Sequence, residues 1–310
     1  MRYTSNGFAA ICIAASLAVL SGGIAFASPL TDAFDIQDYA KAASLALPAA
    51  GKGDHKAEAI LALLYAEGQG VTKDTNAALM WAQKSADAKE PFGQYALGML
   101  HYTGAGVAKN DEEAVKWFRL AADKNLPEAL NALGGAYTEG RGVPAPDLKE
   151  GLTWYQKSAN LGDPAAMEFV GSAYATGVVV IEDHKEAVKW FRKAADKGLP
   201  EAMNALARMY RDGRGVSKSD KDATKWFRSA AELGYSDSQF NLGQAYIQGA
   251  GVPKDSILGI MWYDVSSTQD NPQARLALES LGPSIPADQM RKAKELSKTC
   301  TEQKFKNCGK

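Results

Sequence analysis

The chain has 310 residues, 46% of them hydrophobic and 23% charged, an ordinary globular balance that argues against disorder. Its 35 basic and 36 acidic residues give a net charge of −1. Binding to nucleic acid needs a clustered basic surface, so we expect no nucleic acid partner. Beyond the N-terminus no apolar stretch is long enough to cross a bilayer, and we expect no membrane span in the mature chain.

The first 27 residues have the pattern of a signal peptide. Arg2 is their one charged residue, an apolar run follows from Phe8 to Leu20, and small residues end in Ala25-Phe26-Ala27. An uncleaved membrane anchor is the alternative, but the run is short for a span. We expect cleavage before Ser28, and a mature protein in the periplasm or secreted from the cell.

A capping segment is expected at 28–56. Asp38 stands where a helix N-cap belongs, so 38–50 is predicted to be an unpaired helix in front of the repeats.

The chain then repeats itself with a period of 36 residues. Tryptophans mark the repeat at positions 81, 117, 154, 190, 226 and 262. The strict register predicts that these tryptophans belong to the core rather than to a sugar-binding surface.

Each repeat is predicted to form two helices. The first helix carries an aromatic slot three residues before a glycine, with a large apolar residue and a small residue in the turn before it. The slot is held by Tyr65, His101, Tyr137, Tyr174, Tyr210 and Tyr246. The glycine suits a left-handed helix end, and in five repeats a second glycine follows two residues later. The second helix starts at an N-cap, held in turn by Asp74, Asn110, Asp147, Asp183, Ser219 and Asp255.

The fourth repeat departs from this pattern, because a β-branched run from Val178 to Ile181 replaces the second glycine. That run either packs locally in a reshaped loop or forms an exposed apolar patch, which usually marks a contact site.

The repeats are expected to span 57–281, where Ala274 to Leu281 repeats a first helix. A final helix from about 287 to 298 and a tail complete a C-terminal segment at 282–310. Cys300 and Cys308 lie eight residues apart in that tail and are predicted to form a disulfide in an oxidising compartment; two free thiols are the alternative.

These motifs resemble the Sel-one-like repeat family, a relative of the tetratricopeptide repeats. One copy carries the motif as Ala202, Leu206, Ala207, Tyr210, Gly213, Gly215, Val216, Ser219, Ala223, Trp226 and Phe227. The resemblance implies an all-α fold, a right-handed α/α superhelical solenoid of six to seven helix pairs whose first helices line a concave face. It implies an interaction role and carries over no catalytic residue.

Nothing in the sequence indicates an enzyme. The three histidines His55, His101 and His184 fall in different repeats and lack metal-ligand spacing, so we expect no catalytic residue, no metal and no cofactor. We expect a monomeric interaction scaffold that holds another protein or a peptide segment on its concave face. It could serve envelope signalling or assembly. A secreted host-interaction factor and a cell-wall or lactam hydrolase are the alternatives.

The predicted contact surface lies two and six residues before the aromatic slot, one helical turn apart. We call these positions the partner-binding row. It comprises Tyr95, Met99, Asn131, Glu168, Asn204, Arg208, Phe240 and Gln244. Aromatic residues and arginine are enriched in binding hot spots, and amides can pair with a peptide backbone. The alternative for Tyr95 and Phe240 is that they only help adjacent repeats to pack.

Overall fold

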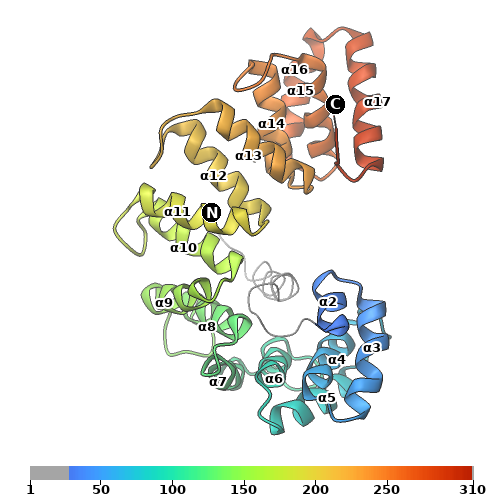
Figure 1. Ribbon diagram of the computed structural model, residues 1–310, viewed down its shortest axis with the longest axis vertical. Helices are drawn as coiled ribbons and strands as arrows, with labels where there is room; N and C mark the ends of the chain where they lie inside the picture. The colour runs from blue at the N-terminus through green and yellow to red at the C-terminus, as the bar shows by residue number, and fades with distance from the viewer. Residues whose placement is uncertain (1–27, 309–310) are drawn as a thin grey trace. The chain divides into compact units, whose positions relative to one another are not determined.

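The computed structural model describes residues 28–308, and in that range the chain is helical without strands. The predicted signal peptide lies outside the described residues. Figure 1 shows the helices following one another in pairs. The first helices of the six repeats are α4 (His55–Glu67), α6 (Pro91–Thr103), α8 (Pro127–Glu139), α10 (Pro164–Thr176), α12 (Pro200–Asp212) and α14 (Ser236–Gln248). The second helices are α5 (Thr75–Asp87), α7 (Asp111–Ala122), α9 (Leu148–Asn160), α11 (His184–Asp196), α13 (Asp220–Glu232) and α15 (Ser256–Ser267).

Further helices lie at both ends of the repeats. They are α2 (Pro29–Asp35) and α3 (Tyr39–Gly51) in front, and α16 (Pro272–Leu281), a short 3₁₀ turn (Gly282–Ser284) and α17 (Ala287–Glu302) behind. The predicted helices at 38–50, 274–281 and 287–298 are therefore present, whereas α2 was not predicted. The all-α solenoid of helix pairs is confirmed.

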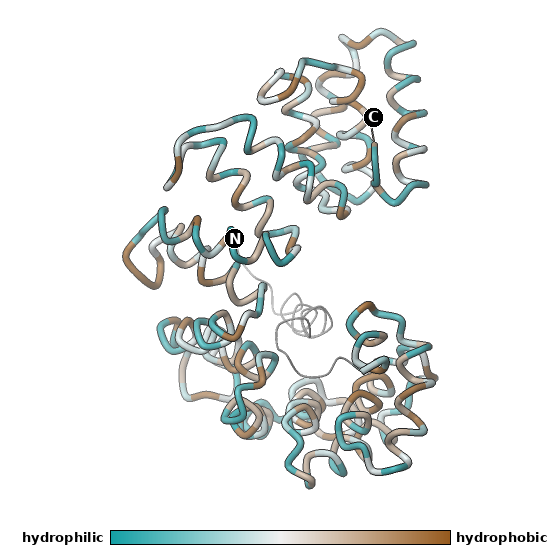
Figure 2. The backbone as a smooth tube through the Cα atoms, in the orientation of Figure 1, coloured by the Kyte–Doolittle hydropathy of each residue, from teal (hydrophilic) through white to brown (hydrophobic). Residues whose placement is uncertain are grey.

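The chain divides into two compact units, which we describe separately. Unit 1 runs up to Val170 and unit 2 starts at Gly171, so the division falls inside α10. Along most helices apolar and polar residues alternate, as the brown and teal segments of Figure 2 show. This is the pattern of helices that bury one face against their neighbours.

The helix ends follow the predicted signals. The side chain at each of the six predicted N-caps accepts a backbone N–H from the first turn of its helix. Five first helices end at a glycine with φ between 69° and 81°, and Gly177 has φ 68°. Local sequence alone therefore fixes where most of these helices begin and end.

The small residue in the first helix makes room for a ring and, at Gly243, also for the carbonyl oxygen of Gly259 at 2.8 Å. A Cβ added at Gly98 would lie 2.7 Å from the ring of Phe118, and one at Gly134 would lie 2.7 Å from the ring of Tyr155. Gly171 and Gly243 face Phe191 and Tyr263 in the same way. In each pair, the aromatic residue that follows the tryptophan fills this space.

The second glycine joins neighbouring repeats, a role beyond the turn that we predicted for it. A Cβ at Gly142 would lie 2.0 Å from the carbonyl oxygen of Asp111, the first residue of the preceding repeat's second helix. Gly106 meets Thr75 at 2.3 Å and Gly251 meets Asp220 at 2.1 Å. In the fourth repeat Val179 takes this position, and glycine's close approach is unavailable to it.

Our prediction that the tryptophans belong to the core is only partly correct. Trp262 is fully buried, in α15, which α17 contacts. The other five are only half-buried, and lysine ammonium groups lie 3.9 Å from the ring centre of Trp154 and 4.2 Å from that of Trp190. The reason is that the next residue along, such as Phe118 or Phe191, faces the first helix and takes the core position.

Candidate interaction surface

In unit 1 the predicted partner-binding row begins inside the protein. Tyr95 is 1% exposed and Met99 is 4% exposed. The Tyr95 ring stacks on Phe92 at 5.8 Å and contacts Phe118 at the same distance. Tyr95 is a core residue because its buried ring packs on other buried rings. Met99 is buried as well, so neither residue is an accessible contact position in this structure.

The extra helix α2 is part of this packing. Phe34 of α2 is fully buried and meets the ring of Phe92 edge-on at 6.2 Å. Ser28 caps α2 through a capping box with Thr31. The sequence signals for α2 were available, namely a serine cap followed by proline, but its seven residues are too few for an apolar period to show.

Farther along unit 1 the row is only half-buried. Asn131 and Glu168 both retain some exposure, and the Oδ1 atom of Asn131 is buried without a hydrogen-bond partner among the described residues. Beside them, burial raises the pKa of Glu128 to about 7, and nearby Asp163 adds to the effect. Burial likewise raises the pKa of Asp35 in α2 to about 6.

In unit 2 the row is mostly polar, and Arg208 is its one exposed residue. Arg208 is exposed and forms no hydrogen bond or ion pair with any described residue, while Gln244 is half-buried. Phe240 is half-buried and stacks on Tyr263 with ring centres 5.4 Å apart. Arg208, Gln244 and the outer edge of Phe240 therefore remain available to a partner.

Asn204 is the buried residue of the row in unit 2. It is 7% exposed, and its Oδ1 accepts hydrogen bonds from the Ser238 hydroxyl at 3.0 Å and from the Asn241 amide at 3.2 Å. Arg211 in turn donates to Oδ1 of Asn241 at 3.4 Å. We had placed Asn204 on the contact surface, whereas its side chain is buried and its carbonyl oxygen accepts hydrogen bonds from α14.

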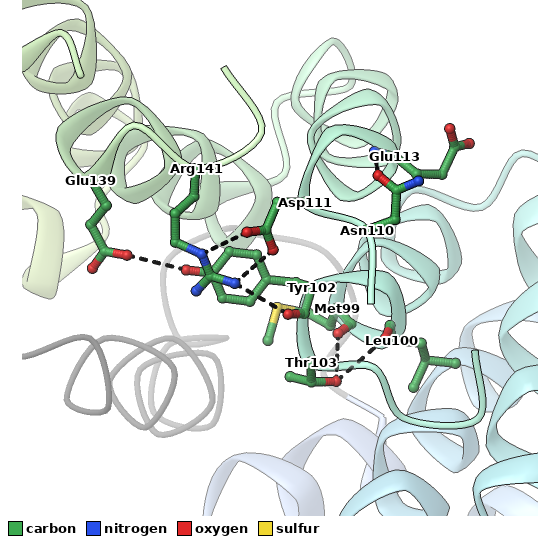
Figure 3. Close-up of polar contacts among 9 residues, drawn as sticks. All are labelled: Met99, Leu100, Tyr102, Thr103, Asn110, Asp111, Glu113, Glu139 and Arg141. Carbon is green, nitrogen blue, oxygen red and sulfur yellow. Dashed lines mark hydrogen bonds and ion pairs between the residues drawn. The ribbon is translucent and has the colours of Figure 1, made fainter. Parts of the chain in front are cut away.

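A charged cluster in unit 1 bridges two repeats, as Figure 3 shows. Arg141 sits between the two glycines of its turn, 3.5 Å above the ring of Tyr102, and binds both carboxylate oxygens of Asp111 at 2.6 and 3.0 Å. The Tyr102 hydroxyl donates to Glu139 at 3.4 Å, and burial raises the pKa of the Glu139 carboxyl.

This cluster has a structural explanation. Arg214 holds the same place in unit 2, where it contacts His184 at 3.0 Å and the carbonyl of Ala175 at 3.4 Å. Because an arginine in that turn reaches back to the preceding repeat in both units, we read the cluster as a link between repeats. It is not a separate site.

The remaining predicted positions lie apart from the row. The sulfur atoms of Cys300 and Cys308 are at bonding distance, 1.98 Å. Val178 is 72% exposed and Ile181 is 91% exposed, so the ends of that run do not pack locally. Among the described residues no group of three or more His, Cys, Asp or Glu side chains could hold a metal ion. None of the described helices has the length and apolarity that a membrane crossing requires.

Comparison with known proteins agrees with the repeat pattern. The Sel1 repeat model matches residues 55–89, 91–126, 127–163, 164–199, 200–235 and 236–271. A Sel1 repeat protein from Oxalobacter formigenes is similar in structure, with 32% identity, a TM-score of 0.68, and coverage of 77% of this chain and 98% of that one. A comparison with curated proteins gives no match.

A second solved structure is a protective antigen present in uropathogenic Escherichia coli strains, which displays the same type of repeat fold. It is 27% identical with a TM-score of 0.51, covering 86% of this chain and 66% of that one.

Proposed function

Since the chain belongs to the Sel1 repeat family, we propose that it is a periplasmic scaffold that holds a segment of another protein on the first helices of unit 2. Sel1 repeat proteins generally mediate protein–protein interactions and are typically not enzymes. The observation that carries the proposal is the open part of the partner-binding row, formed by Arg208, Phe240 and Gln244 on α12 and α14.

The chemistry of this surface suits an extended peptide. Arg208 offers a guanidinium for a carboxylate or a carbonyl, Gln244 offers an amide for the peptide backbone, and Phe240 offers an aromatic edge. The buried hydrogen bonds of Asn204 hold α12 and α14 in register, so the contact residues are presented on rigid elements.

Two features support the periplasmic location. The expected cleavage site precedes Ser28, so a chain that starts at Ser28 retains the cap of α2. The disulfide between Cys300 and Cys308 fits an oxidising compartment. We expect an intact mass that starts at Ser28 and no thiol that reacts with a blocking reagent in the native protein. Retained residues 1–27 would contradict export, and two reactive thiols would contradict the disulfide.

The binding surface is tested with a paired set of variants. The native chain is used to capture partners from envelope extracts, which are identified by mass and then purified. Arg208→Ala with Gln244→Ala should weaken binding of the purified partner about tenfold or more, since hot-spot truncations remove 1–2 kcal/mol or more. Lys225→Ala, an exposed change on the second helix α13, is the matched control. Equal binding by the double variant and the control would place the surface elsewhere, with the Val178–Ile181 run as the next candidate.

A further inference from the structure

Three pairs of neighbouring repeats share a contact that we did not predict. An arginine in one second helix donates to the hydroxyl of the slot tyrosine in the next first helix, 18 residues later. The pairs are Arg119 with Tyr137, Arg192 with Tyr210 and Arg228 with Tyr246. In each pair the guanidinium carbon also lies 5.6–5.8 Å from the ring centre. We call the place where two neighbouring repeats meet a joint. Each of these three joints contains a tyrosine ring and an arginine guanidinium of this chain.

The joint between the first and second repeats lacks both members of this pair. Gln83 stands in the arginine position and His101 in the tyrosine position, the one slot of six without a tyrosine. The Gln83 amide donates to Asp87 on its own helix at 2.8 Å instead of reaching across. The imidazole of His101 is shorter than a phenol, so this joint has neither the phenol nor the guanidinium of the three paired joints.

A hollow lies at this joint. It has a volume of about 580 Å³, is open to solvent, and is lined by Asn76, Leu79, Met80, Gln83, His101 and Val107. A volume of this size is within the range of pockets that accept small ligands or side chains, roughly 300–1,000 Å³.

The wall that α5 contributes also differs in charge from the same positions of α7, α11 and α13. Met80 is 55% exposed, at the helix position held by Lys116, Lys189 and Lys225 in α7, α11 and α13. Asn76 stands where those helices have Glu112, Lys185 and Lys221. Two charged positions are therefore uncharged here, and an exposed thioether stands beside Leu79.

We propose that this hollow docks an aromatic side chain, such as tyrosine, from a segment of a partner protein. The occupant is indicated by the lining, where the exposed thioether of Met80 stands beside Leu79 without the lysine and arginine of the three paired joints. Thioether sulfur packs favourably against aromatic rings, and the amides of Asn76 and Gln83 are available for polar atoms at the rim. This surface is on the second-helix side of unit 1, so the inference stands independently of the proposed function on unit 2.

The test uses the full chain and p-cresol, which is the side chain of tyrosine. With methionine methyl groups labelled, p-cresol should shift the NMR signal of Met80 in a saturable way. Gln83→Arg with His101→Tyr introduces the pair of the three paired joints, so we expect a folded protein whose p-cresol affinity is lower by about tenfold or more. Met80→Lys, which copies α7, α11 and α13, is a second folded variant and should lower the affinity in the same direction.

Two further probes decide the nature of the occupant. A blocked Gly-Tyr-Gly peptide should bind at least as tightly as p-cresol, and 4-methylcyclohexanol, which lacks the aromatic ring, should bind more weakly. The proposal is overturned if p-cresol leaves Met80 unshifted, or if both variants bind p-cresol as well as the native chain. It is equally overturned if the alcohol matches p-cresol, or if the blocked peptide fails to bind where p-cresol does.

Discussion

The same row of the repeat has different surroundings in the two units. In unit 1 the row begins in an aromatic cluster, where Tyr95 stacks on Phe92 and Phe92 meets Phe34 of α2, and it continues with half-buried Asn131 and Glu168. In unit 2 the row is polar, with Asn204 bonded below the surface and Arg208 exposed above it. One repeat motif therefore yields a buried start of the row in unit 1 and an exposed arginine on the row in unit 2. The motif fixes the helices, and the residues between the motif positions decide what each face does.

The largest expected effect comes from truncating the aromatic face of unit 1. Phe92→Ala should lower the free energy of unfolding by about 3–5 kcal/mol, because the ring is 2% exposed and the space beneath α2 cannot refill. Phe240→Ala in unit 2 should cost about 1–2 kcal/mol, since its half-buried ring loses mainly one stacked partner. Urea unfolding of both variants measures the difference. Equal losses would mean that the two faces are packed alike.

The pH dependence of stability should have opposite signs for two carboxyl groups of unit 1 and for a paired carboxyl group of unit 2. Burial raises the pKa of Glu128 from 4.5 to about 7, so folding opposes its ionisation. The contribution of Glu128 to stability is then greatest below pH 4.5 and falls as the pH rises from there through about 7, by on the order of 3 kcal/mol. Asp35 in α2, with its pKa raised to about 6, acts in the same direction.

Glu128→Gln tests this point, because it should flatten the decline between pH 5 and 7. In unit 2 the shift resolved for Asp212 has the opposite sign: the Arg211 guanidinium lowers its pKa, so its contribution is lost as the pH falls. An unchanged slope in the Gln variant would show that Glu128 ionises freely in the folded protein.

A smaller effect comes from one amide position in two repeats. Asn204→Ala should cost about 1–3 kcal/mol, since Ser238 and Asn241 lose their common acceptor. Asn131→Ala at the same position of unit 1 should cost less than half as much, because its buried Oδ1 has no hydrogen-bond partner among the described residues. Thermal or urea midpoints of the two variants give the comparison, and a larger loss at Asn131 would reverse it.

Much of the fold could be read from the sequence because its signals are local. The caps at Asp74 and Asp147 and the left-handed glycines depend on a few neighbouring residues. The surface was harder to predict, because burial depends on what packs above a helix. Tyr95 has an ordinary surface position in its repeat and is covered by neighbouring rings instead.

The arginine–tyrosine pairs and the inter-repeat role of Gly142 were missed for a related reason. Each contact joins residues 18 or 31 positions apart, and only the stacking of repeats brings them together. The constant spacing of 18 between Arg119 and Tyr137, and between Arg192 and Tyr210, was visible in the sequence. Comparing repeats position by position could therefore have suggested the contact.

The smallest expected change in stability belongs to Arg208, and the same residue tests the central claim most directly. Arg208→Ala should alter the free energy of unfolding by less than about 0.5 kcal/mol, because the side chain is exposed and forms no hydrogen bond or ion pair with the described residues. A photo-crosslinking residue placed at position 208 should join the chain to its partner in cells. The same residue at position 225, on the second helix of that unit, should not. Adducts of equal yield at both positions, or none at 208, would contradict the assignment of the open face of unit 2 as the binding surface.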